Sequence, residues 1–234
     1  MAEDLRGCHS QYASSLSADA STVSESALQK AWFRRALSVL HEPRAVYAAM
    51  REESPKAVEA RQEPIVALVF LAGIAAVLAF SSTSRELLDD PGIDGALVPV
   101  LAFLGGGIYG FAGYWVGGLA LYLGIRGAKG EGSFVQARHV LAYALAPMAL
   151  ALAVWPVRLA VYGGDSFRSG GADEGLGHWV FTGISLGFFL WSLALLHLGI
   201  RVVHGFTPIR ALGALVLTAL ALLGLGVLFV VGSA

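Results

Sequence analysis

Residues 95–123 read GALVPVLAFLGGGIYGFAGYWVGGLALYL, a stretch of 29 residues without one charged side chain. An α-helix rises about 1.5 Å per residue, so about 20 apolar residues cross the hydrocarbon core of a bilayer, which is about 30 Å thick. Inside lipid the backbone must satisfy its own hydrogen bonds, and a helix does so. The stretch therefore predicts a membrane-spanning helix and an all-α fold.

Four more apolar segments make the chain a polytopic membrane protein. They are residues 65–80, 139–162, 178–200 and 209–231. The first has only 16 residues and needs flanking residues 62–64 and 81–83 to reach across. The whole chain of 234 residues is 56% hydrophobic and 14% charged, whereas soluble domains carry about a quarter charged residues. We predict a helical bundle with five transmembrane helices.

The N-terminal quarter has a different composition. Residues 1–24 are rich in Ser and Ala and lack the apolar core of a secretion signal, so we expect a disordered cytoplasmic tail. Residues 25–63 are expected to form amphipathic, interfacial helices and a charged linker. In residues 25–40 a helix would place Trp32 and Phe33 on its apolar face and Arg34 and Arg35 on its basic face. This pattern is typical of a helix lying on an anionic membrane surface, and a helix packed against other protein is the alternative.

Prolines mark the boundaries after this amphipathic segment. Pro43 suits the first turn of a second short helix. Pro55 and Pro64 are expected to punctuate the charged linker that leads to the first span.

Basic residues predict the direction of threading. With five crossings, twelve Lys and Arg residues between Lys30 and Arg210 fall on the N-terminal side and three on the other. Because cytoplasmic loops carry the excess of Lys and Arg, we expect a cytoplasmic N-terminus and an external C-terminus. Thirteen Arg against three Lys suggests a GC-rich genome, hence a bacterial inner membrane. Arg158, near the outer end of its span, is expected to snorkel to the surface, and the acidic outer loops to be solvated.

Glycine spacing predicts close helix packing. Gly106, Gly110, Gly113 and Gly117 step by 4, 3 and 4 and line one face of the second span, while Gly183 and Gly187 offer a groove on the fourth. Small residues at this spacing let helices approach closely in lipid. The packing could lie within one bundle or between copies. The alternative is a mobile helix that lines a channel or passive-transport path.

Several functional classes are disfavoured. A net charge of −1 gives no electrostatic case for nucleic acid. Cys8 is the only cysteine, and His139, His197 and His204 have no acidic residue beside them, so we predict no metal and no cofactor. The five apolar segments contain no Asp or Glu, which disfavours ion-coupled transport.

The sequence GISLG at residues 183–187 matches the G-x-S-x-G pattern of serine hydrolases. That pattern works on a strained strand-to-helix turn, whereas Ser185 lies in the middle of a helical apolar run. His197 follows twelve residues later, about 18 Å along the same helix. An intramembrane hydrolase is therefore a remote alternative, and we predict no catalytic site.

From His41 onward, short landmarks occur in the order seen in the Yip1 family of multi-pass membrane proteins, which the chain resembles. The landmarks are EPRAVY at 42–47, the glycine-rich second span, GSF at 132–134, LAYALAP at 141–147 and GIRVVHGFTPIRA at 199–211. Pro43, Tyr143, Pro147, His204 and Gly205 fall on family positions.

The resemblance implies that residues 64–234 form a Yip1-like five-helix domain with a cytoplasmic N-terminus and no enzymatic activity. It leads us to expect a protein that organises or recruits partners at the membrane. The expected partners are the lipid bilayer and either other proteins or a second copy that packs through the glycine-rich faces.

Overall fold

The computed structural model describes residues 37–84, 87–89 and 94–232. This part of the chain is helical throughout, apart from turns and connecting loops. The elements in chain order are α2 (Pro43–Ala49), α3 (Pro55–Ser84), η1 (Gly95–Leu97), α4 (Val98–Gly127), α5 (Phe134–Ala144), α6 (Ala146–Leu150), η2 (Ala151–Val154), α7 (Trp155–Tyr162), η3 (Gly163–Phe167), α8 (Leu176–His204) and α9 (Pro208–Gly232).

Five stretches of the described chain are long and apolar enough to cross a membrane. They are Ala57–Ser84, Gly95–Gly127, Phe134–Phe167, Leu176–His204 and Pro208–Gly232. The predicted all-α architecture with five spans is therefore confirmed. The predicted N-terminal amphipathic helix at residues 25–40 lies mostly outside the described residues.

The third span is broken into short helices. It runs from α5 through α6 and the 3₁₀ turn η2 into α7, with Pro147 near the start of α6 and Pro156 near the start of α7. Proline has no N–H to donate and its ring clashes with the preceding turn, so each break follows from the sequence. The other four spans contain continuous helices of 25 to 30 residues.

The first span differs from the expectation. Residues 51–63 were expected to be a linker, yet α3 begins at Pro55 and continues through Pro64. Pro55 occupies the first helical turn, where its missing N–H costs nothing. Pro64 is buried inside the helix, which tolerates the loss of one backbone hydrogen bond. The span Ala57–Ser84 includes the flanking residues 62–64 and 81–83, as the sequence required, and also extends further towards the N-terminus.

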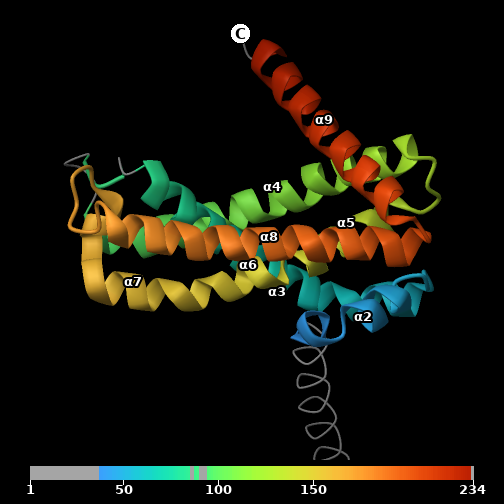
Figure 1. Cartoon of the computed structure of the whole chain (residues 1–234), viewed down its shortest axis with the longest axis horizontal. Coiled ribbons are helices and arrows are strands. Elements are labelled where there is room, and N and C mark those ends of the chain that lie inside the picture. The colour runs from blue at the N-terminus through green and yellow to red at the C-terminus, as the bar shows by residue number, and fades with distance from the viewer. Residues whose placement is uncertain (1–36, 85–86, 90–93, 233–234) are drawn as a thin grey trace, which may run out of the picture.

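The connecting segments gather at two ends of the bundle (Figure 1). At one end, which we call the basic end, the residues after α2 meet the α4–α5 loop and the α8–α9 turn: the Ser133 hydroxyl bonds to Glu53, and Arg51 Nε donates to the Val202 carbonyl at 2.9 Å. At the other, acidic end, Leu88 N donates to the Phe167 carbonyl at 3.2 Å. Successive connections therefore alternate between the two ends, as five membrane crossings require.

Two apolar clusters fill the bundle, one towards each end. The larger includes Tyr47, Leu121 and Ile200, and the smaller includes Trp155 and Phe167 near the acidic end. α9 packs on the last part of α4, where a Cβ at Gly124 would lie 2.5 Å from the Ala214 carbonyl oxygen. Beyond that contact, α9 extends away from the other helices (Figure 1).

Candidate functional site at the basic end

Helix α2 is anchored to α8 by Tyr47. Its side chain is fully buried, and a Cβ at Gly199 would lie 2.8 Å from its Cε1 atom. Only glycine at residue 199 leaves room for this ring. The Tyr47 hydroxyl has no hydrogen-bond partner among the described residues. Burial disfavours the phenolate and raises the pKa of Tyr47 far above its ordinary value, so the ring stays neutral at every physiological pH.

Three arginines of the basic end cap the C-termini of three helices. Arg61 donates to the carbonyls of Ala49 at 2.8 Å and Glu52 at 2.7 Å, at the end of α2. Arg210 donates to those of Ala128 at 2.8 Å and Lys129 at 2.6 Å, after α4.

The third capping arginine is Arg51, which bonds to the Val202 carbonyl in the last turn of α8. The last carbonyls of a helix lack partners within it, and its C-terminus carries partial negative charge, so a guanidinium is favourable there. The three arginines tie α2, α3, α4, α8 and α9 together.

A groove of about 380 Å³ opens beside α2. Both apolar and charged side chains line it, because α2 and the first turns of α3 contribute both kinds. Its lining residues are Ser38, Glu42, Ala45, Val46, Ala49, Met50, Glu52, Ala57, Arg61 and Tyr143. Such a groove can take a segment of a protein partner that carries an apolar anchor and charges of either sign.

The structure brings four of the five family-motif residues to this end of the molecule. Pro43 starts α2, and Tyr143 lines the groove. The His204 Nδ1 atom pairs with the Glu131 carbonyl at 2.6 Å, which joins the end of α8 to the α4–α5 loop. Gly205 ends α8 with φ of 66°, a left-handed conformation that favours glycine. Pro147, the fifth, is buried at the break between α5 and α6.

Gly106, Gly110 and Gly117 of the second span pack against α3 and α5, and not against the fourth span. Gly106 and Gly110 pack against α3, where their Cβ atoms would lie 2.5 Å from Ile74 Cγ1 and 2.6 Å from the Val69 carbonyl oxygen. A Cβ on Gly117 would lie 3.1 Å from the Cδ2 atom of Leu141 on α5.

A Cβ on Gly113, Gly183 or Gly187 would have no neighbouring atom of the described chain within 4 Å. The fourth span is therefore not the partner of the second within one chain. Its groove, like Gly113, faces outward.

The predicted membrane-surface residues Trp32, Phe33, Arg34 and Arg35 lie outside the described residues. Their contacts therefore remain a prediction from the sequence alone.

The acidic end holds a buried ion pair that the sequence does not reveal. Arg158 and Asp173 are bonded at 2.8 Å, with side chains only 4% and 0% exposed. Arg158 also donates to the Ser82 hydroxyl at 3.0 Å.

Its guanidinium lies over the rings of Trp155 and Phe181. The expectation that Arg158 snorkels to the surface is wrong, and so is that of a fully solvated acidic loop. A buried carboxylate from the loop before α8 neutralises the arginine inside the fold.

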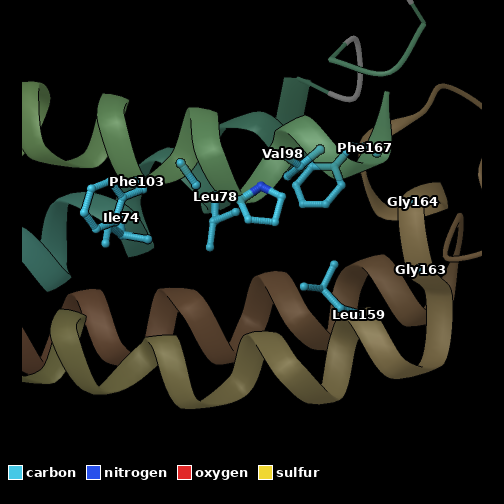
Figure 2. Close-up of a pocket in the computed structure, with 11 residues that line it drawn as sticks. Ile74, Leu78, Val98, Phe103, Leu159, Gly163, Gly164 and Phe167 are labelled. Carbon is cyan, nitrogen blue, oxygen red and sulfur yellow. The ribbon is translucent and has the colours of Figure 1, made fainter. Parts of the chain in front are cut away.

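An apolar cavity of about 430 Å³ lies near this end, between α3 and α4 on one side and α7 and η3 on the other (Figure 2). Leu159 extends into it from α7, opposite Leu78 and Val98. None of its lining residues is charged. The cavity therefore offers an ion no charged side chain, and the glycine face expected to line a channel is in part occupied by α3.

Ser185, the residue weighed as a hydrolase nucleophile, makes a structural hydrogen bond. The Ser185 hydroxyl donates to the Phe181 carbonyl one turn earlier in α8, at 2.9 Å. In the part of the chain that the structure describes, no three His, Cys, Asp or Glu side chains are grouped to hold a metal ion.

Comparison with known proteins agrees with the fold. The family model of the Yip1 domain matches residues 37–231, which is most of the chain. No curated protein and no solved structure matches it. The matched region contains α2, its groove and all five spans. The chain therefore belongs to the Yip1 family and is a multi-pass integral membrane protein.

Proposed function

We propose that this protein is a non-enzymatic membrane organiser that recruits a protein partner through the groove beside α2. The observation that carries the proposal is the groove itself. It lies at the basic end, on a short helix that Tyr47 and the Arg61 cap hold in place. A surface fixed in this way needs little ordering when a partner binds, which favours affinity.

The chemistry of the groove suggests what the partner presents. Ala45 and Val46 offer an apolar contact, while Glu42 and Glu52 carry negative charge and Arg61 carries positive charge. A short amphipathic segment with a basic residue beside an apolar anchor fits this arrangement. Opposite charges across such an interface guide association and fix its register.

We infer that the basic end faces the cytoplasm of a bacterial cell. The arginines at this end and the positive-inside tendency support this orientation. In this orientation Trp32, Phe33, Arg34 and Arg35 precede α2 at the cytoplasmic surface, where we propose that they contact anionic lipid. Salt-sensitive binding of a peptide of residues 25–50 to anionic vesicles would test that contact, and binding equal to that on neutral vesicles would refute it.

We further propose that copies of the chain associate through the glycines left open within one bundle. Gly113 on α4 and the pair Gly183 and Gly187 on α8 lie on exposed surface. Small residues of this kind let a second helix approach closely. Replacement of Gly183 and Gly187 by leucine should shift the protein to a smaller assembly in mild detergent.

Site-specific photo-crosslinking in the native host tests the recruitment. A photoreactive residue at the exposed Ala45 of the groove should capture a discrete partner, and the same residue at Leu176, which is 81% exposed near the acidic end, should not. Arg61→Glu should abolish the Ala45 product, because it removes a groove charge and the α2 cap. Equal products at both positions, or a product unchanged by Arg61→Glu, would contradict the proposal.

A further inference from the structure

Arg138 carries a charge that no carboxylate of the described residues neutralises. It stands on α5, and its aliphatic stem crosses α4 at Gly118, where a Cβ would overlap the arginine Cγ. Its Nε atom is buried without a hydrogen-bond partner. Across the described chain Arg138 has neither a hydrogen bond nor a carboxylate within ion-pair distance. Arg158 at the other end of the bundle has both.

Aromatic rings surround the Arg138 guanidinium. Its central carbon lies 3.9 Å from the ring centroid of Trp115, 4.7 Å from that of Phe134 and 5.2 Å from that of Tyr114. Ring faces attract a cation, but they do not cancel its charge and they accept no strong hydrogen bond. The guanidinium therefore keeps donors for an external acceptor.

The rings also place this arginine at the surface that lipid covers. Trp115 is 53% exposed on α4, a helix that spans the membrane. Arg138 follows Phe134, the first residue of α5, by four residues, which is about 6 Å along a helix. Arginine side chains at this depth are costly unless they reach the polar interface or an anion. The surface where α4 meets α5, which we call the α4–α5 surface, is thus open to lipid and carries a cation without a carboxylate partner among the described residues.

A second arginine stands on the other side of Phe134. The ring of Tyr122 lies 6.1 Å from that of Phe134, and Arg126 bonds to the Tyr122 hydroxyl at 3.2 Å with its guanidinium over the same ring. Arg126 is exposed in the last turn of α4. Two cations and a line of aromatic side chains therefore follow the α4–α5 surface from the end of α4 inward.

From this arrangement we propose that the α4–α5 surface binds a membrane phospholipid through its phosphate group. Arg138 donates to the phosphate oxygens with its planar fork, Arg126 provides a second positive charge, and the acyl chains lie along the exposed face of α4 beside Trp115. Guanidinium groups match phosphate in geometry and charge. A lipid fits better than a soluble phosphate, because the arginine is reached from the surface that acyl chains cover.

The charges of the α4–α5 surface also select among lipids. Two cations favour a headgroup with net negative charge, such as phosphatidylglycerol, over a zwitterionic one such as phosphatidylcholine. The site is distinct from the groove beside α2 that we assign to a protein partner.

Native mass spectrometry of the purified full-length chain tests the site. Phosphatidylglycerol added to the protein in mild detergent should remain bound, and phosphatidylcholine should remain at a much lower level. Arg138→Gln should lower the retained phosphatidylglycerol by at least about 10-fold, the loss expected for charge-assisted hydrogen bonds. Arg44→Gln is the matched control, because it removes one exposed charge from the same end of the molecule and should change nothing.

A second variant and a competition experiment complete the test. Trp115→Leu keeps Arg138 and should weaken retention by about 2- to 5-fold through the loss of the cation–π contact, and it serves if Arg138→Gln does not fold. Glycerol phosphate at millimolar concentration should not displace the lipid. The proposal is overturned if phosphatidylglycerol is retained equally with and without Arg138, if Arg44→Gln has the same effect, or if the soluble phosphate displaces the lipid.

Discussion

Gly73 of α3 and Gly110 of α4 meet backbone to backbone, so that a Cβ on Gly73 would lie 2.8 Å from the Cα of Gly110. Gly106, one turn earlier on α4, lies against the backbone of Ile74 in the same way. In lipid the hydrophobic effect gives little drive for two helices to associate, so close van der Waals packing must supply it. This contact holds the first and second spans together.

Gly110→Ala should destabilise the bundle. The new methyl group would lie 2.6 Å from the Val69 carbonyl oxygen, which is backbone and cannot rotate away. The helices must separate, at a cost of about 1–3 kcal/mol in the free energy of unfolding. Thermal unfolding of the purified protein in mild detergent, followed by circular dichroism, measures the loss.

Gly113→Ala, three residues along α4, is the control for that measurement. Its Cβ would have open space, and alanine is the better helix former. We expect no loss of stability. Equal destabilisation by Gly110→Ala and Gly113→Ala would mean that the contact with α3 does not set the effect, because only Gly110 makes that contact.

Gly199→Ala and changes at Tyr47 should act on stability non-additively. A methyl group at residue 199 would lie 2.8 Å from the tyrosine Cε1, so Gly199→Ala alone should loosen α2 from α8. In a Tyr47→Ala background the ring is absent, and the same substitution should cost clearly less. A double-mutant cycle on unfolding free energies measures the difference, expected between about 0.5 and 3 kcal/mol. Strict additivity would mean that the two residues do not meet.

The sequence predicts the elements of this fold better than their partners. Glycine spacing on the second span suggests a close-packed face, because small residues at helical period have a direct steric meaning. Gly106 and Gly110 pack closely, whereas Gly113 does not. The spacing does not reveal which helix approaches. Gly73 stands alone in its span, while Gly183 and Gly187 offer the clearer pattern, and yet Gly73 makes the contact.

Pro64 and Asp173 show why the remaining features could not be inferred. Proline commonly ends a helix, but the helix of the first span starts before Pro64 and continues through it. Asp173 belongs to a polar loop with glycines at positive φ on either side of it, Gly170 and Gly175. Only the folded path of that loop takes the carboxylate into the bundle.

The carboxylate of Asp89 should make the acidic end weakly pH-dependent. Hydrogen bonds from Ser169, including its N–H at 3.2 Å, hold the pKa of Asp89 below its ordinary value of 3.8. A lowered pKa stabilises the fold above the unfolded value, and this contribution is lost as the pH falls through the folded-state pKa. Because Asp89 is exposed, we expect a small effect.

Comparison of the chain with its Asp89→Asn variant isolates that carboxylate. The stability difference between the two should be present at pH 7 and should shrink as the pH falls below 3.8. A difference that stays constant down to pH 2 would show that Asp89 does not bond to Ser169 as a carboxylate.

Arg158→Leu should be among the most damaging substitutions at the acidic end. It would take the Arg158 guanidinium away from the buried carboxylate of Asp173, and breaking a buried pair in this way costs about 3–5 kcal/mol. Arg158→Met combined with Asp173→Leu removes both charges and should recover part of the loss, since no ion is then left unpaired. Arg168→Gln, on an exposed arginine of the same end, should change the unfolding free energy by less than about 1 kcal/mol. If Arg158→Leu cost no more than Arg168→Gln, Arg158 and Asp173 would have to be solvated, and the loop before α8 would not reach into the bundle.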